Sequence, residues 1–388
     1  MIINGLFFHD ATLILQKEDV IPLIRYSGDI AYRLMSKYQF TLNTNSSNIF
    51  VVKIEPDNLM PNRDPQNHIE KVFASIEKQG YDNKRDTLVL MVVSEGNSSW
   101  NYQMRSYVEN LRPNYNRNNI YFASEQLNND TNDNDLLSKL SFFNQSIEID
   151  KDILLSWDLK HNIPKDKLFL SFNRRPNFHR TQLVLELINN NLIDRGFVSF
   201  CNEIDDANVS DIIDSMHVSN EEKALYKIQL QNSLVLDHGG LHEWDLTSEK
   251  VQDYYKRTYF SIVTETRTKE PELAFTEKTF KPIGHKHPFI LLGKPGLIKW
   301  LHKFGFKTFH PFINESYDDI EDYELRFKFV MSEINRLSNM SHCELENFWT
   351  QTKEITEYNF NYLNSDEFFE CADYCTELLP FIENFKTN

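Results

Sequence analysis

One stretch, residues 259–293, constrains the fold of this chain more than any other. It opens with an apolar run at 259–263 and closes with a second apolar run at 288–292, which Gly293 terminates. Short apolar runs of this kind are typical of parallel strands that are buried on both faces. Between the runs lie a polar loop and the sequence Thr276-Glu277-Lys278, in which Thr276 is suited to cap a helix. The stretch therefore predicts strand, loop, short helix and strand.

Polar side chains gather where the first of these strands ends. Thr264 and Glu265 follow it directly, and Glu277 falls in the first turn of the predicted helix, where a carboxylate suits the helix dipole. Open α/β sheets bind ligands at the carboxyl ends of their strands. A helix N-terminus that also carries a lysine is a natural seat for a phosphate. We therefore expect an anion site at this strand end.

Apolar runs alternate with helical patterns along most of the chain, which predicts an α/β fold with parallel sheets. A length of 388 residues indicates about two domains, and the charged region around Pro164 favours a boundary there. We expect two Rossmann-like domains, 1–155 and 156–388, facing a central cleft, with C-terminal helices of which the last can cross back to the first domain. Strands are predicted at 50–54, 87–93, 119–123, 167–172, 198–201 and 305–309, and the closing helices at 321–338, 342–358 and 366–385.

Composition excludes several classes of protein. The net charge of −16 argues against broad nucleic-acid binding, although it leaves room for a local basic pocket. There is no apolar run of the roughly 20 residues that a membrane span needs, and the first residues lack the features of a signal peptide, so a cytoplasmic protein is expected. Four cysteines do not make a disulfide framework in so long a chain, and metal-ligand spacing is missing. We expect neither a metal nor a cofactor.

Two basic loops follow strands in the second half of the chain. One holds Arg174, Arg175 and Arg180, and the other holds Lys278 with Lys281 one helical turn further on. Cations that converge across the end of a sheet would stabilise a departing diphosphate, as a metal ion does elsewhere. Each of these cations can also be an ordinary solvated charge on the surface, and for Lys281 we expect this second interpretation.

These residues resemble a known family. The segments TEKTFKPI…PFILLG and FLSFNRRPNFHRTQLVLEL, within residues 168–293, are similar to the donor site of fucosyltransferase-like glycosyltransferases, which have the two-domain GT-B fold. The resemblance implies an inverting, metal-independent transfer from a nucleotide-diphosphate sugar, with a GDP-sugar favoured, to a glycan or other hydroxyl acceptor. Pro282, inside the predicted helix, and the turn Gly284-His285-Lys286-His287 depart from the family pattern.

The resemblance also implies roles for individual residues. Arg180 and Lys278 would contact phosphate, Arg174 is a second phosphate candidate, and Glu277 would hold the ribose hydroxyls. Thr264, Glu265 and Thr276 would complete the donor site.

Transfer with inversion needs a base for the acceptor hydroxyl. In the resembled family a carboxylate of the first domain has this role, and Glu95, which follows the strand at 87–93, is the candidate, with Glu125 as a weaker second. Glu95 is explained equally well as a helix cap or an exposed side chain. Glu315 and Asp318 are candidates for sugar or acceptor contacts, although capping of a turn explains them too. Two alternatives stay open: a non-catalytic nucleotide- or sugar-binding module, and an enzyme that glycosylates DNA bases.

Overall fold

The computed structural model divides the chain into two compact units. The first comprises Met1–Ile147, Pro271–Ala274 and Phe369–Asn388, and the second comprises Glu148–Glu270 and Phe275–Phe368. The expected boundary at residue 155 and all but residues 367–368 of the last predicted helix fall outside the residues that the structure describes, and the expected cleft stays a prediction. The described residues are 2–4, 6–10, 39–41, 49–54, 65–78, 80–92, 106, 108–110, 112–124 and 135–137 in the first unit, and 164–204, 207–236, 249–266, 268, 275–365 and 367–368 in the second.

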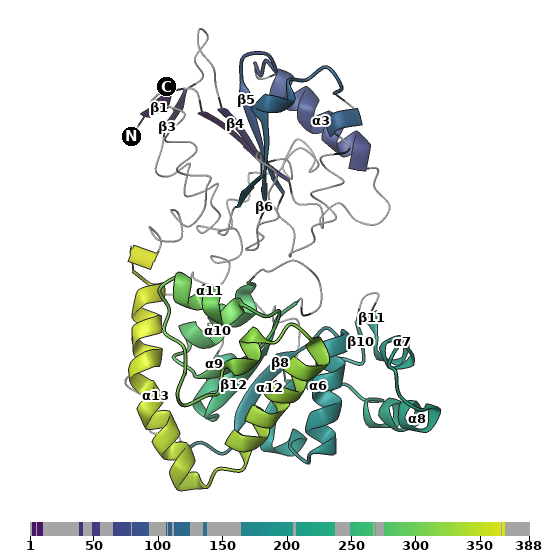
Figure 1. The fold of residues 1–388 in the computed structure, drawn as a ribbon, viewed down its shortest axis with the longest axis vertical. Helices are drawn as coiled ribbons and strands as arrows, with labels where there is room; N and C mark the ends of the chain where they lie inside the picture. The colour runs from purple at the N-terminus through teal and green to yellow at the C-terminus, as the bar shows by residue number, and fades with distance from the viewer. Residues whose placement is uncertain are drawn as a thin grey trace. The chain divides into compact units, whose positions relative to one another are not determined.

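The first unit contains a five-stranded parallel sheet in the order β2-β4-β5-β6-β7. Its central strands are rich in buried apolar residues such as Phe50, Val52 and Leu90, which is why they pair in the middle of the sheet. Helix α3 lies beside β5 (Figure 1) and buries Phe73 and Ile76. The elements are β1 (Ile2–Asn4), β2 (Leu6–Asp10), β3 (Gln39–Thr41), β4 (Ile49–Ile54), α3 (Pro65–Lys78), β5 (Thr87–Val92), η2 (Arg117–Asn119), β6 (Ile120–Ser124) and β7 (Asp135–Leu137), with β1 and β3 forming a separate parallel pair.

The second unit contains a four-stranded parallel sheet in the order β13-β12-β8-β9. Every residue of the two strands β12 and β13 is buried, as the apolar runs of the sequence predicted. The prediction of parallel α/β sheets is therefore confirmed in both units. The strands are β8 (Phe169–Asn173), β9 (Gly196–Phe200), β12 (Phe260–Thr264) and β13 (Phe289–Leu292), and a small antiparallel hairpin joins β10 (Glu203–Ile204) to β11 (Ala207–Asn208).

Helices surround this second sheet (Figure 1). Several begin at polar N-caps that the sequence supplies locally: Asn177 accepts from Arg180 N, and Ser341 forms a capping box with Glu344. The helices are α6 (Phe178–Asn189), α7 (Val209–Asp214), α8 (Asn220–Gln229), α9 (Glu249–Lys256), α10 (Glu277–Gly284), α11 (Leu297–Lys303), α12 (Tyr323–Ser338) and α13 (His342–Leu363), with the 3-10 turns η4 (Ile193–Arg195) and η5 (Ser316–Asp319).

Helix α10 is the short helix that the sequence predicts after β12. Thr276 is its N-cap, and the Thr276 side chain accepts from Lys278 N. The helix has eight residues and includes Pro282, which has no N–H to donate to the backbone carbonyl of Lys278. The predicted cap and the predicted shortness are both confirmed.

The strand predicted at 305–309 is wrong. Residues 306–309 form neither helix nor strand, although Phe306 and Phe309 are buried. The side-chain amide of Asn359 on α13 explains this, because its oxygen accepts from Lys307 N (2.8 Å) and its nitrogen donates to Lys307 O (2.7 Å). A helix side chain thus satisfies the backbone groups that would otherwise pair with a strand.

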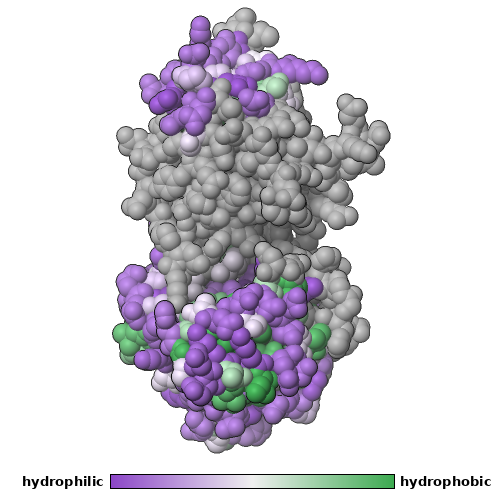
Figure 2. Space-filling view, turned by 90° about the vertical axis from the view of Figure 1, so that its right-hand side faces the viewer, coloured by the Kyte–Doolittle hydropathy of each residue, from purple (hydrophilic) through white to green (hydrophobic). Residues whose placement is uncertain are grey.

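The face of the second unit turned to the viewer in Figure 2 is mostly hydrophilic, with small hydrophobic patches. Scattered exposed apolar residues are ordinary on folded proteins. The large exposed apolar residues of the described part are Leu225, Ile228, Val235, Leu325, Phe329 and Tyr358.

Candidate functional site

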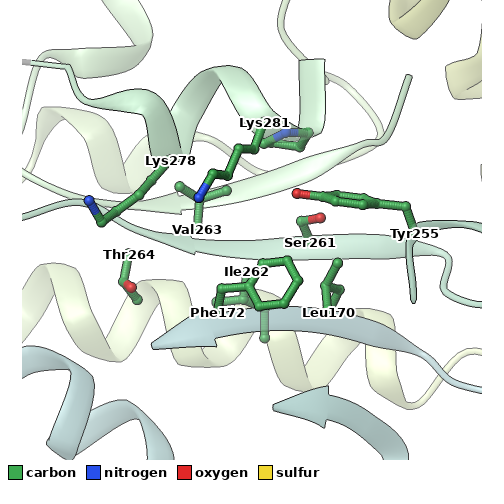
Figure 3. A pocket seen from close by; sticks show the side chains of 10 residues that line it. Leu170, Phe172, Tyr255, Ser261, Ile262, Val263, Thr264, Lys278 and Lys281 are labelled. Atoms are coloured by element: carbon green, nitrogen blue, oxygen red, sulfur yellow. The ribbon is translucent and has the colours of Figure 1, made fainter. Parts of the chain in front are cut away.

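A pocket lies within the second unit, along one side of β12. It is partly open to solvent, and its enclosed space is small, about 30 Å³. Strands β8 and β12 form its floor, and helices α9 and α10 supply the remaining side chains (Figure 3). It is lined by Leu170, Phe172, Tyr255, Ser261, Ile262, Val263, Thr264, Lys278, Lys281 and Pro282. The pocket therefore runs from the middle of β12 to its carboxyl end, with charged groups along an apolar floor.

A buried polar network holds the carboxyl ends of β8 and β12 together. Thr264 Oγ1 donates to Asn173 Oδ1 (2.7 Å), and Asn173 Nδ2 donates to Ser171 Oγ (2.8 Å). Ser171 Oγ in turn donates to Ile262 O (3.1 Å). These polar side chains are buried and hydrogen-bonded to one another, so they fix the strand ends that border the pocket.

Arg180 reaches the same strand end from α6. Only 5% of the residue is exposed, and the guanidinium donates to Thr264 Oγ1 (3.2 Å), Thr264 O (3.2 Å) and Arg175 O (3.1 Å). Since Thr264 lines the pocket together with Lys278, the two predicted phosphate residues approach one strand end from different elements. These hydrogen bonds give Arg180 a structural role at the end of β12 in addition to its positive charge.

Glu265 is a buried carboxylate that ties α10 to the end of β12. It accepts hydrogen bonds from Thr276 N (3.2 Å), from Thr276 Oγ1 (2.5 Å), from Thr279 Oγ1 and from Thr266 N (3.3 Å). A Cβ on Gly293 would touch Glu265 and collide with Leu297, which explains why glycine ends β13. Glu265 and Thr276 thus position the start of α10, and with it Lys278.

The two lysines of α10 occupy different depths. Lys278 is half-buried, and its ammonium donates to Thr276 Oγ1 at 3.4 Å. Lys281 is 6% exposed, so the expectation of a solvated surface charge was wrong. Its position three residues after Lys278 places it on the same face of the helix, and this face packs over the sheet. Burial of a lysine in a helix with so many polar neighbours was not visible in the sequence.

Three histidines beside this region were missed as supporting residues. His179 Nε2 donates to Glu265 O (2.7 Å), which leaves Nδ1 to accept from Thr268 Oγ1 (3.2 Å). His285 stacks on Tyr255 with ring centroids 4.0 Å apart, and burial lowers the pKa of His285 to about 3. Burial also lowers the pKa of His287. All three are buried, and the two in the turn after α10 are neutral, so they support the pocket by packing and hydrogen bonding.

Asp318 has the capping role that the sequence left open, whereas the Glu315 side chain binds a neighbouring loop. Asp318 Oδ1 and Oδ2 accept from the backbone N–H groups of Ile298 (3.1 Å) and Lys299 (3.2 Å) at the start of α11, whose own N-cap is a glycine. Glu315 accepts from Phe309 N (2.7 Å) and from Thr308 Oγ1 (2.7 Å). Burial raises the pKa of both carboxyl groups. A contact of either with a sugar stays a prediction.

The structure describes the remaining predicted site residues only in part. Glu95 and Glu125 lie outside the described residues. Glu277 is the first residue of α10, as predicted, and the description does not extend to its side chain. Arg174 is half-buried next to the end of β8, and its carbonyl accepts from Cys201 N (3.0 Å). Within the described ranges, no group of three or more His, Cys, Asp and Glu side chains could hold a metal ion. Nor is any helix in those ranges long and apolar enough to cross a membrane.

These features define a parallel α/β protein with a cationic pocket at the carboxyl end of a buried strand. No family model matches the sequence, and no curated protein matches it either. A solved structure described as "OtsA apo structure" is similar to this chain with a TM-score of 0.39 and 10% identity, covering 86% of this chain and 74% of that one. A similarity at this level establishes neither the fold nor the function of this chain.

Proposed function

We propose that this protein is a glycosyltransferase with a GT-B fold. It would move a sugar from a nucleotide-diphosphate sugar, with a GDP-sugar favoured, to a hydroxyl acceptor, with inversion and without a catalytic metal. The observation that carries the proposal is the entry of Lys278 and Lys281 into one pocket at the carboxyl end of β12. The resemblance of residues 168–293 to fucosyltransferase-like enzymes supplies the class of reaction.

The proposed chemistry on the donor side is electrostatic. As the bond between the sugar and the diphosphate breaks, negative charge accumulates on the departing phosphate oxygens. The Lys278 ammonium and the positive end of the α10 helix dipole would stabilise that charge. Arg180, held against Thr264, adds positive charge beside the same strand end, and Arg174 is the second phosphate candidate. Glu277, at the first position of α10, would hold the ribose hydroxyls.

The acceptor side of the proposal rests on the first unit. Glu95 would take the proton of the acceptor hydroxyl as its oxygen attacks the anomeric carbon from the face opposite the departing diphosphate. That geometry inverts the anomeric centre and leaves the proton on the Glu95 carboxylate. The acceptor would be a glycan or another molecule with a free hydroxyl.

The test is a thermal-shift panel of GDP-, UDP-, ADP- and CMP-linked sugars on the wild-type protein and on Lys278→Met. We expect one diphosphate-linked donor to raise the melting temperature of the wild type and the variant to lose most of this response. Lys328→Met, which removes an exposed lysine on α12, is the control for the change in charge. If no donor shifts the wild type, the proposal fails.

Turnover is tested separately, by release of the nucleoside diphosphate in the presence of candidate acceptors. Glu95→Gln should bind the donor normally and release product at least ~100-fold more slowly, since general bases contribute factors of this order. Donor binding without turnover under any condition would instead indicate a non-catalytic binding module.

A further inference from the structure

The pocket on β12 has an inner end, which Tyr255 and Lys281 form over the middle of the strand. Both residues are almost fully buried, with Lys281 6% and Tyr255 2% exposed. Figure 3 shows the Lys281 side chain extending over Val263 and the Tyr255 hydroxyl pointing toward it from α9. Lys278 lies at the other end, beside Thr264. The two lysines therefore belong to different parts of the pocket.

The Tyr255 hydroxyl faces the pocket without a protein partner. Within the described residues, no side chain or backbone group forms a hydrogen bond with this oxygen, although Tyr255 is 2% exposed. Burial of a hydroxyl without a hydrogen bond costs free energy, so such groups are uncommon. Burial also raises the pKa of Tyr255, so the hydroxyl keeps its proton and can donate it. Tyr255 thus points to a small ligand that accepts a hydrogen bond inside the pocket.

The charges around this hydroxyl are positive. The Lys281 ammonium only donates hydrogen bonds, and among the described residues that line the pocket there is no carboxylate. His285 stacks on Tyr255 with ring centroids 4.0 Å apart. Burial and the positive charges of Lys281 and Lys256 lower the pKa of His285 to about 3, so its ring is neutral. These surroundings repel a cation and attract an anion.

The size of the pocket limits which anion can enter its inner end. The enclosed space is about 30 Å³, and one water molecule needs roughly 10–15 Å³ on this measure. Nucleotides, phosphate and sulfate are too large for that space, whereas a single chloride or bromide ion is only slightly larger than a water molecule. The floor consists of buried apolar residues, among them Leu170, Ile262 and Val263, which suit a weakly hydrated monovalent ion.

We propose that the inner end of the pocket binds one halide ion, chloride under physiological conditions, between the Lys281 ammonium and the Tyr255 hydroxyl. This inference goes beyond the proposed function and does not depend on it. The ion accepts a hydrogen bond from each group and offsets positive charge in a site of low polarity, so it stabilises the second unit. The diphosphate of the proposed donor would stay at the outer end, beside Lys278.

The test is a chloride titration of the full-length wild-type protein at constant ionic strength, in which sodium chloride replaces sodium gluconate stepwise. We expect the melting temperature to rise by roughly 2–4 °C and then to level off, because an ion that binds only the folded state stabilises it in a saturable way. The chloride NMR signal should also broaden in the presence of the protein. Lys281→Met should lose both responses. Lys278→Met, which removes the same charge from the outer end, is the matched control and should keep both.

Further variants and ions separate the outcomes. Lys281→Arg should keep part of the response, and Tyr255→Phe, which removes one oxygen from a buried ring, should weaken the apparent chloride affinity about 10-fold. Bromide should replace chloride, and sulfate should produce no saturable shift. If the wild type melts at the same temperature in chloride and gluconate and broadens the chloride signal no more than Lys281→Met, the inner end holds water only and the inference is refuted. If Lys281→Met and Tyr255→Phe keep the wild-type response, chloride binds elsewhere and the inference is equally refuted. Neither result affects the proposed function, which the nucleotide-sugar panel tests.

Discussion

Replacement of Arg180 by methionine should destabilise the second unit, and the size of the effect follows from the contacts of the guanidinium. The side chain is 5% exposed and donates to one hydroxyl and two carbonyl oxygens at the ends of β8 and β12. Methionine fills similar volume and donates nothing. A buried polar group that loses its partner costs about 1–3 kcal/mol, so with some relaxation the variant should lose roughly 2–4 kcal/mol. Arg180→Lys keeps one donor group and should lose about half as much.

The assay is urea unfolding followed by tryptophan fluorescence, because Trp300 and Trp349 both lie in the second unit. With a slope of about 2–3 kcal/mol per molar urea, the methionine variant should unfold at a midpoint lower by roughly 1–2 M. Hydrogen exchange should become faster in peptides that cover β8 and β12. Arg175→Met, which changes an exposed arginine of the same loop, is the matched control and should change the free energy of unfolding by less than about 0.5 kcal/mol.

One result would refute this reasoning. If Arg180→Met unfolds at the wild-type midpoint with unchanged hydrogen exchange, the three hydrogen bonds contribute nothing to stability. A loss of nucleotide binding under those conditions would make Arg180 a ligand contact alone.

Two further predictions concern the supports of the site. Asp318→Ala removes the carboxylate that caps α11 from η5 and should lower the free energy of unfolding by about 1–3 kcal/mol, with faster hydrogen exchange at the start of α11; unchanged exchange there would contradict the capping role. His285→Phe should flatten the acid side of the stability profile. The folded-state pKa of His285 is about 3 and that of the unfolded chain is near 6.5, so the unfolded state binds more protons between these values and stability falls as the pH is lowered through this window. In the phenylalanine variant, the free energy of unfolding should fall by up to ~1.4 kcal/mol less per pH unit than in the wild type. The measurement is the urea midpoint of both proteins from pH 4 to pH 8. Parallel pH profiles for wild type and variant would show that the pKa of His285 does not change on unfolding.

Features that depend on neighbouring residues in the chain were predictable. The apolar runs of β12 and β13, the Thr276 cap of α10 and the shortness imposed by Pro282 all follow from local sequence and are all present. The strand expected at 305–309 shows the limit of this reasoning. Its composition favours a strand, but the side chain of Asn359, which is distant in the sequence, hydrogen-bonds to both the N–H and the carbonyl oxygen of Lys307.

The site residues show the same division. Glu265 was predicted as a donor-site residue from the family resemblance, and the structure shows its carboxylate bound to Thr276 and Thr279. Lys281 was expected on the surface, where most lysines lie. The packing of α10 over β12 instead buries it along the pocket. The base expected at Glu95 remains a prediction, because it falls outside the described residues.

The sequence by itself determined the class of fold and the strand end at which charge gathers, because strand burial, helix caps and proline breaks act within a few residues. The tertiary structure decided which charges enter the pocket and which hold the scaffold. That division depends on which elements pack together: Arg180 meets Thr264 across 84 positions, and Asp318 caps a helix that begins some 20 positions earlier. Separations of this kind leave no local pattern, since the hydrogen bonds form only after the sheet and its helices have been brought into contact.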